Sequence, residues 1–173
     1  LLKSKIHEER LAALLILVEK YKKSKKKKMK KEIVDFYLQH KYAVNNWDLV
    51  DLTADKILGD YLLDQKRDLL YDYANSPRLW DRRIAVVSTF AFIRAMQFQD
   101  TFNLCEKLLK DQHEHDLIHK ACGWMLREVG KRDAEALNGF LRTHYYKMPR
   151  TMLRYAIERF PSPKRKAYLE GKI

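Results

Sequence analysis

A tryptophan and an aspartate stand four positions apart in the segment N-N-W-D-L-V-D, which covers residues 45–51. If the segment is helical, this spacing places Trp47 and Asp51 on the same face, one turn apart. A fixed carboxylate stabilises positive charge that develops in a transition state, and the face of an indole ring attracts cations. The pair therefore has the chemistry of a site for a cationic substrate or intermediate.

The polar neighbours in this segment have a simpler explanation. Asn46 can cap a helix, because its side-chain oxygen can accept a hydrogen bond from a backbone N–H group at the helix start. Asp48 then falls in the first turn, where the helix dipole stabilises an anion. Asp51 lies beyond that turn, so the start of the helix explains neither Asp51 nor Trp47.

Similar apolar segments recur along the chain at nearly constant intervals. They follow Arg10, Trp47, Arg83 and Lys120, and the separations are 37, 36 and 37 residues. A weaker copy follows Arg150 after a further 30 residues. Helix pairs that recur every ~35 to 40 residues are typical of an α-α superhelix, or solenoid, of HEAT/ARM-like repeats, whose apolar stripes are buried between neighbours. The alternative is an irregular helical bundle.

The repeat register brings the tryptophan and the aspartate into a larger group. Trp47 and Arg83 share the first position of the register, and Asp51 and Trp124 lie four positions further on. If the repeats stack in parallel, these residues form one ridge on a wall of the superhelix. The first repeat has Leu14 at the second of these positions, so packing does not require an aspartate or a tryptophan there.

The elements that must position this ridge are predicted to be helices. The chain has five Gly and four Pro, and no long stretch alternates apolar and polar residues, so strands find little support. Ser76–Pro77 and Asp133 are expected helix starts, and Pro161 and Pro163 an expected helix end. The fold class is therefore all-α. The expected helices are 6–23, 28–40, 47–63, 66–74, 77–95, 99–110, 114–130, 133–144, 149–159 and a short terminal helix from 163.

Composition indicates one domain with a polyanionic partner. A chain of 173 residues with 46% apolar content can bury one core, so we expect a single domain over residues 1–173. The net charge of +12 favours nucleic acid or an anionic membrane as partner, with a merely basic soluble protein as the alternative. The longest near-apolar runs, 11–18 and 84–93, are well short of the ~20 residues of a spanning helix, so no membrane insertion is expected.

The two cysteines indicate the cellular compartment, and the start of the chain indicates an absent N-terminal part. Cys105 and Cys122 form neither a C-x-x-C motif nor a disulfide framework, so we expect buried thiols and a cytoplasmic location. The chain begins at Leu1 without a Met, a signal peptide or a helix cap. We therefore expect that an N-terminal part is absent.

A known family resembles this chain in three segments. The DNA alkylation repair enzymes of AlkD type are alkylpurine DNA glycosylases made of HEAT-like repeats. The segments that resemble them are W-D-L-V-D at 47–51, R-L-W-D-R-R-I-A at 78–85 and K-A-C-G-W-M-L-R-E at 120–128. The resemblance runs from residue 7 to residue 158. It implies a single HEAT-like repeat domain that lacks the family's N-terminal helices.

The resemblance also implies a reaction. The family's catalytic carboxylate corresponds to Asp51, its two cleft tryptophans to Trp47 and Trp124, and a phosphate-contacting arginine to Arg83. The implied activity is hydrolysis of the N-glycosidic bond of cationic N3- or N7-alkylated purines in double-stranded DNA, without base flipping, to leave an abasic site. A cationic base is a good leaving group, so no general acid, metal or organic cofactor is expected. No lysine is placed to form a Schiff base, so the enzyme is expected to be monofunctional.

Basic residues are expected to hold the duplex by neutralising phosphates. Arg83 is the first candidate for this role. The other expected DNA-binding residues are Arg82, Lys120, Arg127, Arg150 and Arg154. The run K-S-K-K-K-K-M-K-K at 23–31 is the densest charge of the chain, and the sequence leaves open whether it is a solvated edge or a DNA contact.

The histidine-rich stretch at 113–119 does not predict a metal site. His115 and His119 stand one turn apart, but the H-E-x-x-H spacing is absent and no third ligand is evident. Two other function classes stay open, namely a non-catalytic HEAT-like DNA-binding protein and a scaffold for an acidic protein partner. A monomer is expected.

Overall fold

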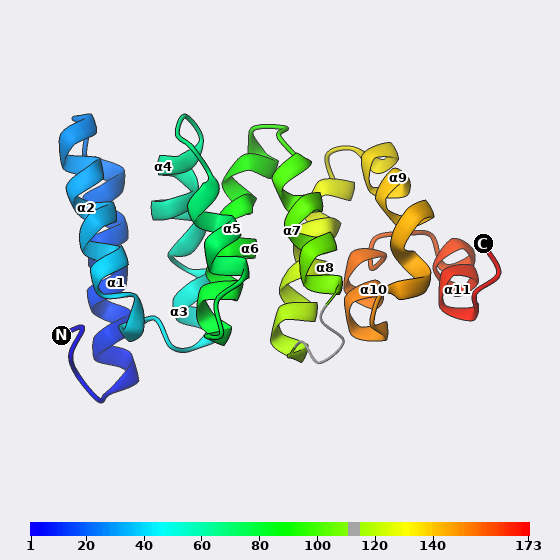
Figure 1. The fold of residues 1–173 in the computed structure, drawn as a ribbon, viewed down its shortest axis with the longest axis horizontal. Helices are drawn as coiled ribbons and strands as arrows, with labels where there is room; N and C mark the ends of the chain where they lie inside the picture. Colours follow the sequence, from blue (N-terminus) through cyan, green and yellow to red (C-terminus); the bar gives the residue numbers. More distant parts are fainter. Residues whose placement is uncertain (111–114) are drawn as a thin grey trace. The chain divides into compact units, whose positions relative to one another are not determined.

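The computed structural model describes residues 1–110 and 115–173 as helices, turns and loops (Figure 1). No strand occurs among these residues, which confirms the all-α prediction. The helices are α1 His7–Lys23, α2 Lys27–Gln39, α3 Trp47–Asp51, α4 Asp60–Leu62, α5 Asp68–Ala74, α6 Leu79–Arg94, α7 Gln99–Leu109, α8 Asp116–Gly130, α9 Ala134–His144, α10 Arg150–Ala156 and α11 Ser162–Glu170. Short turns of 3-10 helix, η1 Lys41–Ala43 and η3 Tyr145–Lys147, follow α2 and α9. A superhelix of repeats is compatible with this order of helices and stays a prediction.

The chain contains two compact units, Leu1–Phe92 and Ile93–Ile173. The expectation of one repeat domain over residues 1–173 stays a prediction. In the first unit, α1 and α2 run side by side in opposite directions, and the next helical segment begins with α3 and ends with α4 (Figure 1).

Apolar side chains one turn apart build the core of the first unit. The buried residues of α1 are Leu14, Leu17, Val18 and Tyr21. Their spacing of three or four positions places them on one face of the helix, which packs inward. The largest fully buried side chains of the unit are those of Leu14, Tyr37, Leu49, Ile57, Leu58, Leu70, Ile84 and Phe92.

The predicted helix 47–63 is interrupted, and this is the main departure from the expected elements. After α3, residues Asp55–Gly59 form a single π-helical turn, η2, before α4 begins. The backbone N–H of Asp60 donates to the carbonyl of Asp55, five residues earlier. The hydroxyl of Thr53 donates to the Leu49 carbonyl at 2.5 Å and lies 3.1 Å from the Tyr37 hydroxyl. Side-chain bonds to backbone carbonyls and inserted π turns both disturb a regular helix, and the pattern of apolar residues does not report either.

Gly59 allows η2 to approach α6 closely. A Cβ atom at this position would lie 2.2 Å from the backbone oxygen of Ser88 and 2.9 Å from the Cβ of Ala91. The hydroxyl of Ser88 also donates to the carbonyl of Ala54, at 3.4 Å. A side chain at position 59 would therefore force the two backbones apart.

The second unit is built around α8 and α10, which pack closely. A Cβ atom at Gly123 would lie 2.5 Å from both the carbonyl oxygen of Met152 and the Cβ of Tyr155. Cys105 and Cys122 are free and buried in the core, as expected. The hydrogen bond from the Ala136 N–H to the Asp133 carboxylate, at 2.8 Å, confirms the predicted start of α9.

The other predicted helix boundaries agree with the structure to within a few residues. The backbone N–H of Arg78 donates to the Ser76 hydroxyl at 3.2 Å, just before α6, as expected for a helix start. The ninth expected helix ends early, at Ala156, and the terminal helix starts at Ser162 after Pro161. That helix ends at Gly171, whose φ of 68° is the left-handed conformation that glycine adopts at low cost.

We expect Gly59→Ala to lower the free energy of unfolding by about 2 kcal/mol, because the added methyl group overpacks the contact with Ser88. Gly139→Ala is the matched control, since a Cβ at Gly139 meets nothing within 4 Å. It should raise stability by about 0.5 kcal/mol through its effect on the unfolded chain. Urea unfolding followed by far-ultraviolet circular dichroism measures both changes. Equal stabilities of the two variants would contradict the close approach.

Candidate functional site

The segment that carries Trp47 and Asp51 begins as the sequence predicts. The Asn46 side chain accepts a hydrogen bond from the Trp47 N–H at 2.8 Å, and Asp48 lies in the first turn of α3. One oxygen of Asp48 accepts from the Leu49 N–H at 2.9 Å, and the other lies 2.7 Å from the Nε2 atom of His7. Asn46 and Asp48 therefore act in starting and anchoring the helix.

Asp51 forms a two-point ion pair with Arg83. The Nε atom of Arg83 donates to one carboxylate oxygen at 2.9 Å, and its Nη2 atom donates to the other at 2.8 Å. The side chains of Asp51 and Arg83 are 17% and 6% exposed, so the pair is largely shielded from water. Two parallel hydrogen bonds between planar groups fix the orientation of the carboxylate.

The pKa of Asp51 lies above its ordinary value despite this ion pair. Burial raises the pKa by disfavouring the charged form, and the hydrogen bonds and charge of Arg83 oppose that effect. The nearby carboxylates of Asp48 and Asp55 raise it further. Loss of water around the carboxylate therefore outweighs the attraction of one arginine.

Trp47 is exposed, although it starts the same short helix. The residue is 53% exposed, which is unusual for a large aromatic side chain. It stands one turn before Asp51, so an accessible indole and a partly accessible carboxylate lie next to each other on α3. This arrangement leaves both groups able to contact a ligand.

The loop that leads into α3 is held by the first turn of α6. The Nη2 atom of Arg78 donates to the carbonyls of Lys41 and Val44, at 2.9 and 2.8 Å. Its Nη1 atom contacts the Asp81 carboxylate at 2.5 Å. That carboxylate also accepts from Lys41 Nζ at 2.7 Å and from the Ser76 hydroxyl at 2.9 Å. One buried aspartate thus ties together the two chain segments that position the ion pair.

Sequence reasoning did not identify Asp81 as a functional residue. Burial acts to raise its pKa, but hydrogen bonds from Lys41, Arg78 and Ser76 outweigh that effect and hold the pKa below its ordinary value. In the sequence, Asp81 is only an acidic residue in the first turn after the Ser76–Pro77 helix start. The helix dipole alone would explain an acidic residue there. Its contact with Lys41, 40 positions earlier, is a property of the fold.

The expected DNA-binding residues differ in burial and in the hydrogen bonds and ion pairs that their side chains make within the chain. Arg83 is 5% exposed, and Arg82 donates to the Ser76 carbonyl at 2.7 Å. Lys120 pairs with Asp116 at 2.8 Å, and Arg127 pairs with Glu158. Arg150 donates to the Leu169 carbonyl at 3.2 Å and is exposed, as is Arg154.

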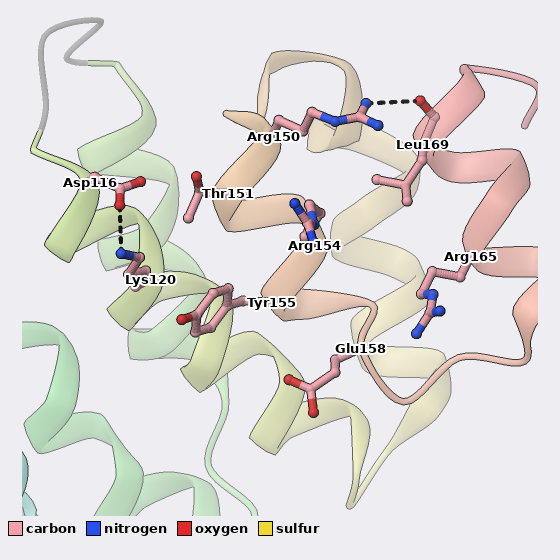
Figure 2. A pocket seen from close by; sticks show the side chains of 9 residues that line it. All are labelled: Asp116, Lys120, Arg150, Thr151, Arg154, Tyr155, Glu158, Arg165 and Leu169. Carbon is pink, nitrogen blue, oxygen red and sulfur yellow. Dashed lines mark hydrogen bonds and ion pairs between the residues drawn. The ribbon is translucent and has the colours of Figure 1, made fainter.

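A basic pocket in the second unit brings three of these residues together (Figure 2). Lys120 of α8 and Arg150 and Arg154 of α10 line a hollow of about 690 Å³, together with Arg165 of α11. The other lining residues are Asp116, Thr151, Tyr155, Glu158 and Leu169. Four cations against two carboxylates, with hydroxyl groups between them, are suited to an oxyanion such as phosphate.

The sequence did not indicate the contribution of α11 to this pocket. Arg165 lies in the basic run 164–166, which has the pattern of an ordinary exposed surface. Neither Arg154 nor Arg165 makes a side-chain hydrogen bond or ion pair within the part of the chain that the structure describes. Their guanidinium groups are therefore available to a ligand.

Trp124 lies on α8, between Lys120 and Arg127, and is partly exposed. It belongs to the second unit, whereas Trp47, Asp51 and Arg83 belong to the first. The expectation that Trp124 and Asp51 face one nucleotide stays a prediction.

The histidine-rich stretch lies only partly within the described residues. Residues 113 and 114 fall outside them, and His115 acts as the cap of α8, its Nδ1 atom accepting from the Leu117 N–H at 3.1 Å. Across residues 1–110 and 115–173, no group of three His, Cys, Asp or Glu residues could hold a metal ion. Among the same residues, no helix has the length and apolar character needed to span a bilayer.

Comparison with known proteins gives one match. The family model described as DNA alkylation repair enzyme matches residues 1–160. Comparisons with curated proteins and with solved structures give no significant match.

Asp81→Asn is expected to lower the free energy of unfolding at neutral pH by about 3 kcal/mol, because Lys41 and Arg78 lose their buried counter-ion. The native pKa of Asp81 is depressed, so its stabilisation is complete above the unfolded value of about 3.9 and disappears as pH falls through the native pKa. The difference between parent and variant should therefore shrink in acid. Urea unfolding at several pH values measures it.

Asp72→Asn provides the comparison, because Asp72 is exposed on α5. Its effect should stay within about 0.5 kcal/mol. A loss in Asp81→Asn that is no larger than this, or that does not change with pH, would contradict the anchoring role of Asp81.

Proposed function

The chain belongs to the DNA alkylation repair enzyme family, and from this premise we propose that it is a monofunctional DNA glycosylase. It would hydrolyse the N-glycosidic bond of cationic N3- or N7-alkylated purines in duplex DNA and leave an abasic site. The observation that carries this proposal is the partly accessible carboxylate of Asp51, fixed by two hydrogen bonds from buried Arg83 beside the exposed indole of Trp47.

The chemistry needs a fixed negative charge. As the bond to the base breaks, the sugar acquires oxocarbenium character, and a nearby carboxylate stabilises it. Two unit charges about 4 Å apart attract by roughly 4 kcal/mol at an effective dielectric of 20, which corresponds to a rate factor of about a thousand. The positive charge of Arg83 offsets part of the negative charge of Asp51, but its two hydrogen bonds hold the carboxylate in place. The remaining lone pairs of Asp51 can orient the attacking water.

The leaving group explains why a single carboxylate suffices. An alkylated purine already carries positive charge, so it departs without protonation by a general acid. The Trp47 face attracts cations by about 0.5 to 2 kcal/mol, which favours the damaged base or the sugar cation over neutral DNA. Trp124 is proposed for the same role on the basis of the repeat register and the family resemblance.

The duplex would be held through its phosphates. The basic pocket of Lys120, Arg150, Arg154 and Arg165 supports this, because guanidinium groups bind phosphate oxygens in a two-point geometry. Arg82 and Arg127 are proposed as further contacts. The burial of Arg83 and its pairing with Asp51 favour a role in positioning the carboxylate over a phosphate contact.

Asp51→Asn should lower excision of 7-methylguanine from a methylated duplex at least about a hundredfold, because the negative charge is removed while the shape is kept. Affinity for the duplex should stay nearly the same, since phosphate contacts supply it. Single-turnover base release measures the first quantity, and fluorescence anisotropy with a labelled duplex measures the second.

Asp72→Asn is the control, because Asp72 is an exposed carboxylate of the same unit. It should excise at the parental rate. Equal rates in the parent and in Asp51→Asn would remove Asp51 from the mechanism. Tight, salt-sensitive duplex binding by a parent protein that releases no base would instead identify a non-catalytic DNA-binding protein.

The dependence of excision on pH should report the environment of Asp51. Its raised pKa means that the carboxylate is lost on acidification at a pH above the ordinary aspartate value of about 3.9, and excision should fall there. Arg83→Gln removes the charge that opposes the shift, so this acidic limb should move to higher pH. Arg83→Lys keeps the charge and should stay closer to the parent.

Single-turnover rates measured across pH, after subtraction of the release without enzyme, give the position of the acidic limb. Circular dichroism confirms that each variant is folded at every pH used. An identical limb in the parent and in a folded Arg83→Gln variant would show that this ion pair does not control the ionisation of Asp51.

A further inference from the structure

The turn between α1 and α2 carries more positive charge than any other part of the chain. Eight of the ten residues 22–31 are lysines, and we call this stretch the lysine turn. All of these lysines except Lys30 are exposed. Neither the candidate site of the first unit nor the basic pocket of the second uses them.

Carboxylates of the same unit neutralise only part of this charge. Lys30 Nζ binds Asp60 at 2.9 Å, and Lys31 Nζ binds Asp35 at 2.6 Å. Asp64 also faces the turn, and Glu32 follows it in α2. No carboxylate of the described residues pairs with the lysines at positions 25–28.

The lysines at the start of α2 destabilise this helix in the isolated protein. The helix begins at Lys27 without a side-chain cap at Lys26 and without an acid in its first turn. Positive side chains there oppose the positive end of the helix dipole, and neighbouring lysines repel one another. A polyanion bound at the turn would relieve both effects.

The lysine turn also borders a hollow large enough for a ligand group. Lys25, Lys27 and Lys28 line it from the turn, and Tyr61 and Gln65 line it from the region of α4. The volume of the hollow is about 670 Å³. Ammonium groups on flexible stems act as point charges, which suits phosphates whose positions vary along a nucleic acid backbone.

We infer that the lysine turn is a second, sequence-independent binding surface for the phosphodiester backbone of duplex DNA. This inference rests on the proposed function, because it assigns the polyanion as the DNA that presents its lesion to Asp51. The contact between Lys30 and Asp60 docks the turn on α4, at the end of the helical segment that starts with Trp47 (Figure 1).

The distance along this segment matches a short stretch of duplex. Asp60 lies nine positions after Asp51, and a regular α-helix of that length spans about 14 Å at 1.5 Å per residue, which is an upper bound here because of the turn at residues 52–53 and η2. About four base pairs of duplex cover the same length at 3.4 Å each. A duplex with its lesion at Asp51 and its axis along this segment would bring its backbone to the lysine turn within a few base pairs.

A triple variant with Lys25→Gln, Lys27→Gln and Lys28→Gln tests the inference through binding of undamaged duplex. Each lost phosphate contact lowers the slope of log affinity against log salt by about 0.9, so the three substitutions should lower it by up to about 2.7. Affinity at about 0.1 M salt should fall at least tenfold. The matched control carries Lys110→Gln, Lys147→Gln and Lys166→Gln, which remove the same charge from dispersed, exposed positions.

The outcomes separate this inference from its alternatives. A slope and affinity equal to the parent, or an equal loss in the control, would overturn the inference. Binding to phosphatidylserine vesicles that the triple variant loses, while its duplex binding is kept, would make the turn a membrane contact instead. A melting temperature of the free triple variant at or above that of the parent confirms that it is folded.

The proposed function can fail independently. A parent protein that releases no methylated base but loses duplex affinity in the triple variant would keep the lysine turn as a DNA contact and reject the glycosylase. A parent that excises methylated bases, with a triple variant that binds duplex as the parent does, would reject the lysine turn alone.

Discussion

The ion pair between Arg83 and Asp51 is the interaction on which the candidate site depends. Taking either ion out of water is costly, and the cost is offset here because the guanidinium presents two donors to the two carboxylate oxygens. The pairing requires α6 to lie close to the helical segment that begins with α3. Gly59 permits this, since it brings the backbone of η2 against the Ser88 carbonyl of α6. The close packing that Gly59 allows therefore keeps Arg83 within hydrogen-bonding distance of the Asp51 carboxylate.

Local signals in the sequence predicted local structure well. Asn46 and Asp133 were identified as helix starts because a cap involves only neighbouring residues. The interruption at η2 was missed, because the apolar pattern of residues 47–63 does not report a side-chain bond to a backbone carbonyl or an inserted π turn. The burial of Arg83 was missed for a similar reason. The repeat register placed it near Asp51, but register alone does not say whether an arginine points to solvent or to a carboxylate.

Part of the positive charge of the chain is bound within the fold and is not accessible to a ligand. Arg78 and Arg83 serve the interior of the first unit, where each is bound to an aspartate. Lys120 is held by Asp116, whose pKa it lowers, and is available only in part. Arg154, Arg165 and the lysine turn remain accessible. Positive charge therefore falls into structural and accessible groups, and the accessible group includes two clusters, the basic pocket and the lysine turn, besides dispersed lysines such as Lys110 and Lys147.

The π turn has a consequence for how the first unit tolerates change in chain length. A regular helix rotates by about 100° per residue, whereas a π turn takes up one additional residue by winding less per residue, so the helix after η2 keeps nearly the same orientation. Asp51 precedes the turn, whereas Asp60, with its partners Tyr21 and Lys30, comes after it. Loss of one residue within η2 would therefore restore a regular helix and leave both Asp51 beside Arg83 and Asp60 beside Tyr21 and Lys30. The π turn thus allows the first unit to accommodate a difference of one residue in chain length without changing which residues the two ends of this segment contact.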